Sequence, residues 1–149
     1  MYTQHYGCKC MSSAVVPAAP AFLADVCAEH TIEIVFDNRN DAFSHIFPFV
    51  VTSPPFTAIR EWRITVQTSD YNNYIDVGVY TEMIGKINSK VSLYLYGKFM
   101  GATTLYHEFS ISKSTLESNR EWTESGKLSI HVEVHEREFK AKPRVVYAT

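Results

Sequence analysis

In the stretch Arg60-Glu61-Trp62-Arg63-Ile64-Thr65-Val66-Gln67, polar and apolar side chains alternate from Glu61 to Gln67. Successive side chains of an extended strand point to opposite faces, so Trp62, Ile64 and Val66 share one face and the polar residues share the other. A strand with one apolar face needs a second layer of structure to cover that face. The stretch therefore predicts a β-strand in a layered domain.

Similar runs lie on both sides of this stretch, separated by turn residues such as Asp37 to Asn40 and Ser53-Pro54-Pro55. Further strands are expected at Thr31 to Phe36, Ile46 to Val51, Tyr74 to Met83, Lys90 to Tyr96, Thr103 to Ile111 and Lys127 to His135. Their predicted inward residues are Ile75, Val77, Val79, Val91, Leu93, Leu95, Leu105, Phe109, Ile111, Leu128, Ile130, Val132 and Val134. Ile84 to Ser89 is compatible with a hairpin, and Ser114 to Glu117 reads as a capping box for a short helical turn.

This pattern predicts an all-β fold, an antiparallel β-sandwich of about seven to eight strands with one short helical turn. A closed barrel is the alternative, and a parallel sheet is disfavoured because crossover helices are absent from the pattern. Residues 30–136 are expected to form the sandwich. Residues 1–29 lack periodicity and read as an N-terminal tail or arm, and residues 137–149 as a C-terminal tail in which Val145 to Tyr147 could add an edge strand.

Composition narrows the classes of partner. The chain has 149 residues, 46% of them hydrophobic, which suits one domain with one core. Its 14 basic and 16 acidic residues give a formal net charge of −2, so neither nucleic acid nor an anionic membrane is an expected partner. No continuous apolar run is long enough to span a bilayer.

The three cysteines, Cys8, Cys10 and Cys27, all precede the first expected strand. They could not cross-link the folded part to itself, which favours a reducing, cytoplasmic or nuclear location. Cys8-Lys9-Cys10 lacks a second ligand pair at zinc spacing, so no metal site is predicted there. His131 and His135 lie about 13 Å apart along a strand and could not share an ion. No cofactor is expected.

From His30 to Glu136 the chain resembles the MATH domain, the meprin and TRAF homology (TRAF-C-like) fold. The likeness rests on Ser53-Pro54-Pro55-Phe56 before Glu61-Trp62-Arg63-Ile64-Thr65-Val66, on Tyr74-Ile75-Asp76-Val77-Gly78-Val79-Tyr80, on Lys90 to Tyr96, on Tyr106-His107-Glu108-Phe109, and on Gly126 to Val134. The resemblance implies an eight-stranded sandwich that binds short extended peptides on one sheet and has no catalytic activity.

Two departures from the family pattern affect the peptide site. A Trp-Gly-Phe-like segment usually follows the strand matched by Tyr106 to Ile111, where this chain has Ser112 to Arg120. Peptide-binding members also carry an aromatic residue near the position of Gly78, and His107 stands where another is common. The resemblance therefore leaves the usual peptide specificity, and the groove itself, open.

Outward tyrosines give the candidate partner-binding surface. Tyrosine combines a large apolar ring with a hydroxyl, which suits a surface that is dry when bound, although cross-strand pairs that merely shield a sheet have the same pattern. The predicted surface comprises the outward tyrosines Tyr74, Tyr80, Tyr94, Tyr96 and Tyr106, together with Gly78 and His107, the two positions that the resemblance implies for the groove.

The leading hypothesis is a non-enzymatic adaptor domain that binds an extended peptide or partner protein on this surface. The alternative is a structural subunit that self-associates into homo-oligomers, exchanging the segments before Thr31 and after Glu136. A hydrolase is a third hypothesis, and it requires a nucleophile and a carboxylate beside His107. The sequence carries no nucleophile elbow, phosphate loop or metalloprotease motif.

Overall fold

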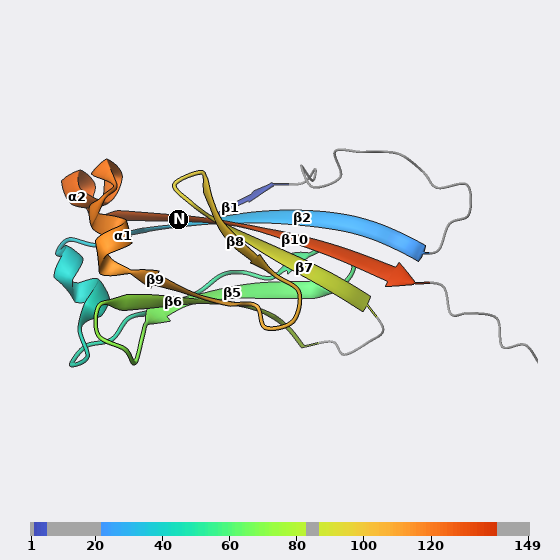
Figure 1. The fold of residues 1–149 in the computed structure, drawn as a ribbon, viewed down its shortest axis with the longest axis horizontal. Helices are drawn as coiled ribbons and strands as arrows, with labels where there is room; N and C mark the ends of the chain where they lie inside the picture. The colour runs from blue at the N-terminus through green and yellow to red at the C-terminus, as the bar shows by residue number, and fades with distance from the viewer. Residues whose placement is uncertain (1, 6–21, 83–86, 140–149) are drawn as a thin grey trace, which may run out of the picture.

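Two antiparallel sheets pack face to face in the computed structural model, which describes residues 2–5, 22–82 and 87–139 (Figure 1). The first sheet has the strand order β1 (Tyr2–His5), β2 (Phe22–Val35), β10 (Lys127–Phe139), β7 (Ile87–Leu95) and β8 (Lys98–Thr103). The second has the order β3 (Val50–Thr52), β5 (Glu61–Thr68), β6 (Tyr74–Thr81) and β9 (Glu108–Ser112), and β4 (Phe56–Thr57) also pairs with β5. The expected all-β antiparallel sandwich is confirmed.

The core lies between the sheets and follows the predicted alternation. On β5, Trp62, Ile64 and Val66 are fully buried while Glu61 and Arg63 are exposed. Nearly all of the other predicted inward residues are buried as well, on β6, β7, β9 and β10. Burying each large aliphatic side chain contributes about 1.5–3 kcal/mol, so this layer supplies the main stabilisation of the fold.

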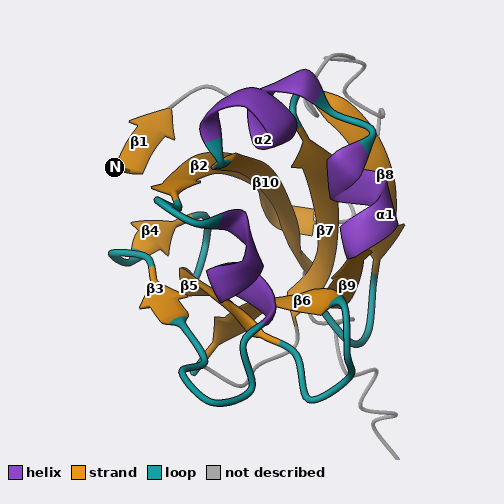
Figure 2. Ribbon diagram, turned by 90° about the vertical axis from the view of Figure 1, so that its left-hand side faces the viewer, coloured by secondary structure: helices purple, strands orange, loops and turns teal. Residues whose placement is uncertain are grey.

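Short helices cover one end of the sandwich (Figures 1 and 2). The expected helical turn is α1 (Lys113–Glu117), but its N-cap is Ser112, whose hydroxyl accepts from the Thr115 amide, rather than Ser114. A second helix, α2 (Arg120–Ser125), and a 3-10 helix, η2 (Arg39–Phe43), were not predicted. Leu116 of α1, Trp122 of α2 and Ala42 of η2 bring these short elements into the core.

Several strand boundaries differ from the predictions. The expected strand Thr103 to Ile111 is divided between β8 and β9, and Leu105, expected inward, is 76% exposed in the connecting loop. Only the last part of Ile46 to Val51 is a strand. The expected hairpin at Ile84 to Ser89 is wrong, because β6 pairs with β5 and β9 in the second sheet whereas β7 pairs with β10 and β8 in the first. Local turn residues do not specify which sheet the next strand enters.

The N-terminal part of the domain starts earlier than expected. β2 begins at Phe22, so part of the expected arm is a central strand, and β1 pairs with the same strand from its other side. Cys27 therefore lies within β2, and it is disulfide-bonded. This finding overturns the cysteine argument for a reducing compartment. Cys8, Cys10 and Val145 to Tyr147 lie outside the described residues, and β10 continues beyond Glu136 to Phe139.

Among the described residues, the helices are too short to cross a bilayer.

Candidate binding cleft

His107 connects the two sheets at the end of the β8–β9 loop. Its Nε2 lies 2.9 Å from the Ser89 hydroxyl on β7, and its Nδ1 lies 2.8 Å from the Thr103 hydroxyl on β8. Its backbone carbonyl accepts a 2.9 Å hydrogen bond from the Val79 amide on β6. One side chain thus fixes the loop against the first sheet while its backbone extends the pairing of the second.

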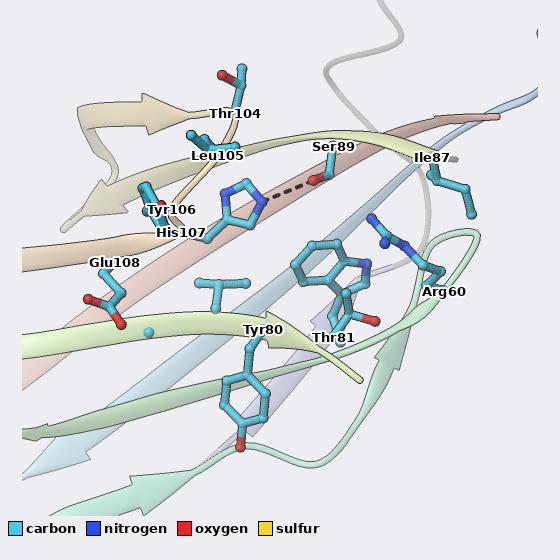
Figure 3. Close-up of a pocket in the computed structure, with 13 residues that line it drawn as sticks. Arg60, Tyr80, Thr81, Ile87, Ser89, Thr104, Leu105, Tyr106, His107 and Glu108 are labelled. Atoms are coloured by element: carbon cyan, nitrogen blue, oxygen red, sulfur yellow. Dashed lines mark hydrogen bonds between the residues drawn. The ribbon is translucent and has the colours of Figure 1, made fainter. Parts of the chain in front are cut away.

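A cleft of about 460 Å³ opens beside this loop (Figure 3). Its lining includes Gly78 and Tyr80 of β6 and the loop residues Leu105, Tyr106 and His107. Tyr80 projects away from His107, on the other side of β6 (Figure 3). The cleft therefore turns around the edge of the second sheet, from the gap between the layers to the outer face.

A second hollow, of about 440 Å³, continues along the outer face of β6 and β9. It shares Gly78, Tyr80 and Glu108 with the first cleft and adds Tyr71 and Phe109. We call the two together the β6 groove. A Cβ built on Gly78 would meet no atom of the described residues within 4 Å, so the absent side chain leaves open space at the point where the two hollows join.

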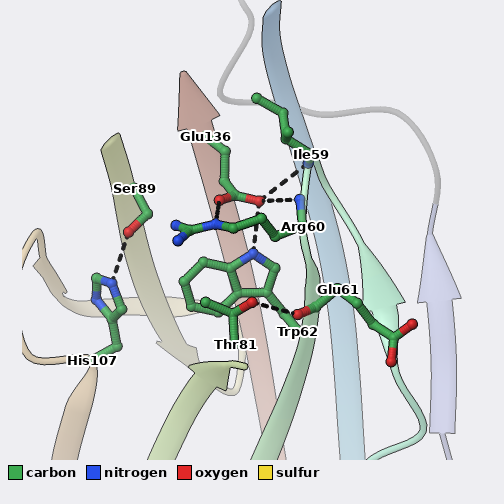
Figure 4. Close-up of polar contacts among 8 residues, drawn as sticks. All are labelled: Ile59, Arg60, Glu61, Trp62, Thr81, Ser89, His107 and Glu136. Atoms are coloured by element: carbon green, nitrogen blue, oxygen red, sulfur yellow. Dashed lines mark hydrogen bonds and ion pairs between the residues drawn. The ribbon is translucent and has the colours of Figure 1, made fainter. Parts of the chain in front are cut away.

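The inner wall of the groove is fixed by a buried carboxylate network (Figure 4). Glu136 of β10 is fully buried and accepts hydrogen bonds from the backbone amides of Ile59 and Arg60, at 3.1 and 2.8 Å. It also accepts from Arg60 Nε at 2.6 Å and from Trp62 Nε1 at 2.8 Å. Because both oxygens are well partnered, the charge is accommodated and the first sheet is joined to β5.

Burial and the nearby Arg60 guanidinium lower the pKa of the His107 imidazole, while Glu136 opposes this shift. A neutral imidazole has one donor and one acceptor nitrogen, and its two hydroxyl partners can satisfy both. The hydrolase hypothesis required a carboxylate beside His107, but Nδ1 faces the Thr103 hydroxyl instead. With both ring nitrogens facing hydroxyls, the His107 side chain fixes the loop against β7 and β8.

The predicted tyrosine surface is divided by the fold, and the prediction of one shared face is wrong. Tyr74 and Tyr80 lie on the outer face of the second sheet, each 41% exposed, and Tyr106 is 79% exposed in the loop beside them. Tyr94 lies on the outer face of the first sheet, on the opposite side of the molecule, where burial and Glu133 raise the pKa of its phenol. The structure therefore brings together Gly78, Tyr80, Tyr106 and His107, with Tyr74 further along the same strand.

Tyr96 belongs to neither face. It has a positive φ of 51° in the turn after β7, packs against the core and donates its hydroxyl to the Lys127 carbonyl at 2.5 Å. Burial raises the pKa of its phenol. The alternation rule failed here because the strand ends at Leu95, one residue earlier than expected.

Arg60, Trp62, Ser89 and Glu136 were not predicted as members of the site. Glu136 and Arg60 are separated by 76 positions, so no short motif records their contact. The sequence did contain one signal for Glu136. It follows Val132 and Val134 at a spacing of two, so a charged residue falls on the buried face of β10.

No protein-family model matches the chain, and no curated protein matches it.

Proposed function

We propose that this chain is a non-enzymatic adaptor domain that binds an extended peptide segment of a partner protein along the β6 groove. The observation that carries the proposal is the placement of Leu105 and Tyr106. These two large side chains, 76% and 79% exposed, line the groove beside the end strand of a sheet. Exposed apolar and aromatic residues beside a recess are typical of protein-interaction sites.

The edge of β9 supports backbone recognition. β9 pairs with β6 on one side and, within the described part of the chain, ends the second sheet on the other. A peptide laid along this edge would pair with its backbone and add a strand to the sheet. Alternate side chains of the peptide would then face the hollow lined by Gly78, Tyr80 and Ser110, which would provide specificity.

The resemblance to the MATH domain supports the same class of function, because such domains bind extended peptides on one sheet. The agreement in fold class is consistent with this family. The departure at Gly78 is consistent with a different specificity, since the missing side chain leaves room for a residue of the ligand.

A displayed library of short peptides, selected on the full chain, would supply ligands for a direct test. Fluorescence anisotropy would then compare the wild type with Tyr80→Ala, Tyr106→Ala and Gly78→Trp. We expect each change to weaken binding by at least about tenfold, as for residues at the centre of an interface. Tyr94→Ala is the matched control, because Tyr94 lies on the opposite face and should leave affinity unchanged.

Two outcomes would reject the β6 groove as the peptide-binding site. One is the failure of the library to yield any ligand, and the other is a ligand whose affinity responds to Tyr94→Ala but to none of the three groove variants. Circular dichroism of each variant separates loss of binding from loss of folding.

Self-association is the second candidate function, and the position of β1 favours it. β1 forms the outer edge of the first sheet by pairing with β2 of the same chain, and a terminal edge strand is an element that two copies can exchange. Light scattering on the full chain and on a chain lacking residues 1–21 provides the test. A mass that depends on concentration only in the full chain supports exchange, and a monomer in both removes this candidate.

The cellular location belongs to the proposal as well. The adaptor proposal includes an intracellular location, whereas a disulfide at Cys27 is typical of oxidising environments. Thiol labelling of the protein, extracted from its source under acid-quenched conditions, distinguishes an intracellular location from an oxidising compartment. A Cys27 that labels only after reduction places the protein in an oxidising compartment, and immediate labelling supports the intracellular proposal.

A further inference from the structure

A cluster on the outer face of the first sheet suits a metal ion. Glu29 of β2 and Glu133 of β10 are directly opposed across the two strands, and His131 lies two residues before Glu133 on the same face. One ligand atom from each of the three residues can be chosen so that all lie within 4.8 Å of one another. We propose that Glu29, His131 and Glu133 bind a divalent transition-metal ion of the zinc type. This inference does not depend on the peptide groove, which lies on the other sheet.

The burial of Glu29 is the independent observation that points to a ligand. Glu29 is 4% exposed, and its Oε1, which faces His131, has no hydrogen-bond partner among the residues that the structure describes. A buried carboxylate oxygen without a partner costs several kcal/mol unless a cation compensates it. The opposed Glu133, 7% exposed, adds a second carboxylate at the same place, and like charges directly opposed on a sheet repel.

The distances favour a metal ion over a shared proton. His131 Nε2 lies 3.8 Å from Glu29 Oε1 and 3.6 Å from Glu133 Oε1. An imidazolium that donated to either carboxylate would close to about 2.7–2.9 Å. Two ligands on a tetrahedral zinc ion, with bonds of about 2.0 Å, are separated by about 3.3 Å. The observed spacing is close to the second value, so small side-chain movements would complete the coordination.

Neighbouring hydroxyls orient the proposed ligands. The Thr31 hydroxyl lies 2.8 Å from His131 Nδ1, and with Nδ1 donating to it, Nε2 keeps its lone pair facing the two carboxylates. The Tyr94 hydroxyl donates to Glu133 Oε2 at 3.3 Å, which leaves Oε1 directed at His131. Such outer hydrogen bonds are a regular feature of protein metal sites.

The chemical types of the three ligands, and the access of solvent to the site, indicate which class of ion would bind. One imidazole and two carboxylates suit Zn²⁺, and three protein ligands leave a fourth position for water. An open cleft of about 660 Å³, lined by the three residues together with Thr31 and Tyr94, gives solvent a route to that position. Sequence reasoning missed the site because it compared histidines within one strand, whereas two of the ligands face each other across β2 and β10.

Calorimetric titration of the full chain with Zn²⁺, after removal of bound metal with EDTA, tests the proposal. We expect one ion per chain, and affinity at least about a hundredfold weaker in Glu29→Gln and in His131→Gln. Thr31→Ala should weaken binding by about 10–100-fold through loss of ring orientation, and Thr31→Ser should restore it. His135→Gln is the control on the same strand, since His135 is paired with Asp25 and should not affect binding.

Absence of Zn²⁺ binding by the wild type would overturn the proposal. It would also be overturned by binding that none of the Glu29, His131 and Thr31 variants changes, because the ion would then lie elsewhere, for example on cysteines. Circular dichroism identifies variants that fail to fold. If Glu29→Gln or His131→Gln fails to fold, the comparison of Thr31→Ala with Thr31→Ser decides, since both keep every proposed ligand.

Discussion

Glu29 and Glu133 are paired directly opposite each other on β2 and β10, and both side chains are buried. Paired strands place such residues within about 5 Å of each other at Cβ, so two carboxylates at these positions repel when no cation lies between them. Among the described residues, a third buried carboxylate, Glu136, forms an ion pair with Arg60.

Replacing Glu29 with Gln should therefore stabilise the metal-free protein. We expect the free energy of unfolding, measured with urea in the presence of EDTA, to rise by about 0.5–1 kcal/mol as the repulsion is removed. The control is Glu33→Gln on the same strand, which loses an ion pair with Lys127 at 3.4 Å and should give no increase. A decrease in Glu29→Gln that matches or exceeds the decrease in Glu33→Gln would contradict this account of the pair.

Removing the Glu136 carboxylate should strongly destabilise the fold. In Glu136→Ala the Arg60 guanidinium and the Trp62 indole lose their buried partner, and we expect a loss of about 3–5 kcal/mol in urea unfolding. Glu124→Ala is the matched control, because its ion pair with Arg120 is exposed and is worth less than about 0.5 kcal/mol. Similar losses in the two variants would show that the network does not join the sheets.

Stability should fall as the pH drops below the ordinary histidine pKa of 6.5, in part because of His107. Its pKa is lowered in the folded state, so the unfolded chain binds more protons at mildly acidic pH. The contribution is fully present above pH 6.5 and is lost as the pH falls toward the folded-state value. Urea midpoints between pH 7.5 and pH 5 should decline less steeply in His107→Gln than in the wild type, and equal slopes would exclude His107 as the cause.

Gly126 should tolerate substitution far less well than Gly97. Both have positive φ, 65° and 76°, so alanine at either site pays a cost of about 1–2 kcal/mol for the left-handed backbone. A Cβ on Gly126 would also lie 2.4 Å from the Phe36 carbonyl oxygen, whereas one on Gly97 would meet nothing within 4 Å. Thermal unfolding should therefore show a larger loss in Gly126→Ala than in Gly97→Ala. Equal losses would mean that the backbone near Phe36 yields to the added methyl group.

The sequence predicted which side chains of each strand are buried better than it predicted which strands pair with one another. Alternation placed Ile75, Val77 and Val79 inward correctly because burial in a sheet depends on a period of two, which is a local property. It could not assign β6 and β7 to different sheets, since pairing depends on contacts between distant segments. Tyr80 and Tyr94 were therefore placed on one surface although they lie on opposite faces of the molecule.

The candidate site was predictable only in part for the same reason. Tyr80 and Tyr106 were found because they lie in or beside strands with clear alternation, and Gly78 and His107 were included because the resemblance to the MATH domain marked their positions. Glu136 was not, because its partners Trp62 of β5 and Arg60, just before that strand, are far away in sequence. The exposed position of Leu105 was missed because a loop interrupts what looked like one continuous strand.

Hydrogen–deuterium exchange of the full chain, with and without a saturating peptide selected from the library, tests the central claim most directly. The account predicts slower exchange for the amides of Glu108–Ser112, because those that face away from β6 would gain hydrogen bonds from the added strand. The edge strand of the other sheet, Lys98–Thr103, should be unchanged. Protection of Lys98–Thr103 with unchanged exchange in Glu108–Ser112 would contradict the proposed binding site.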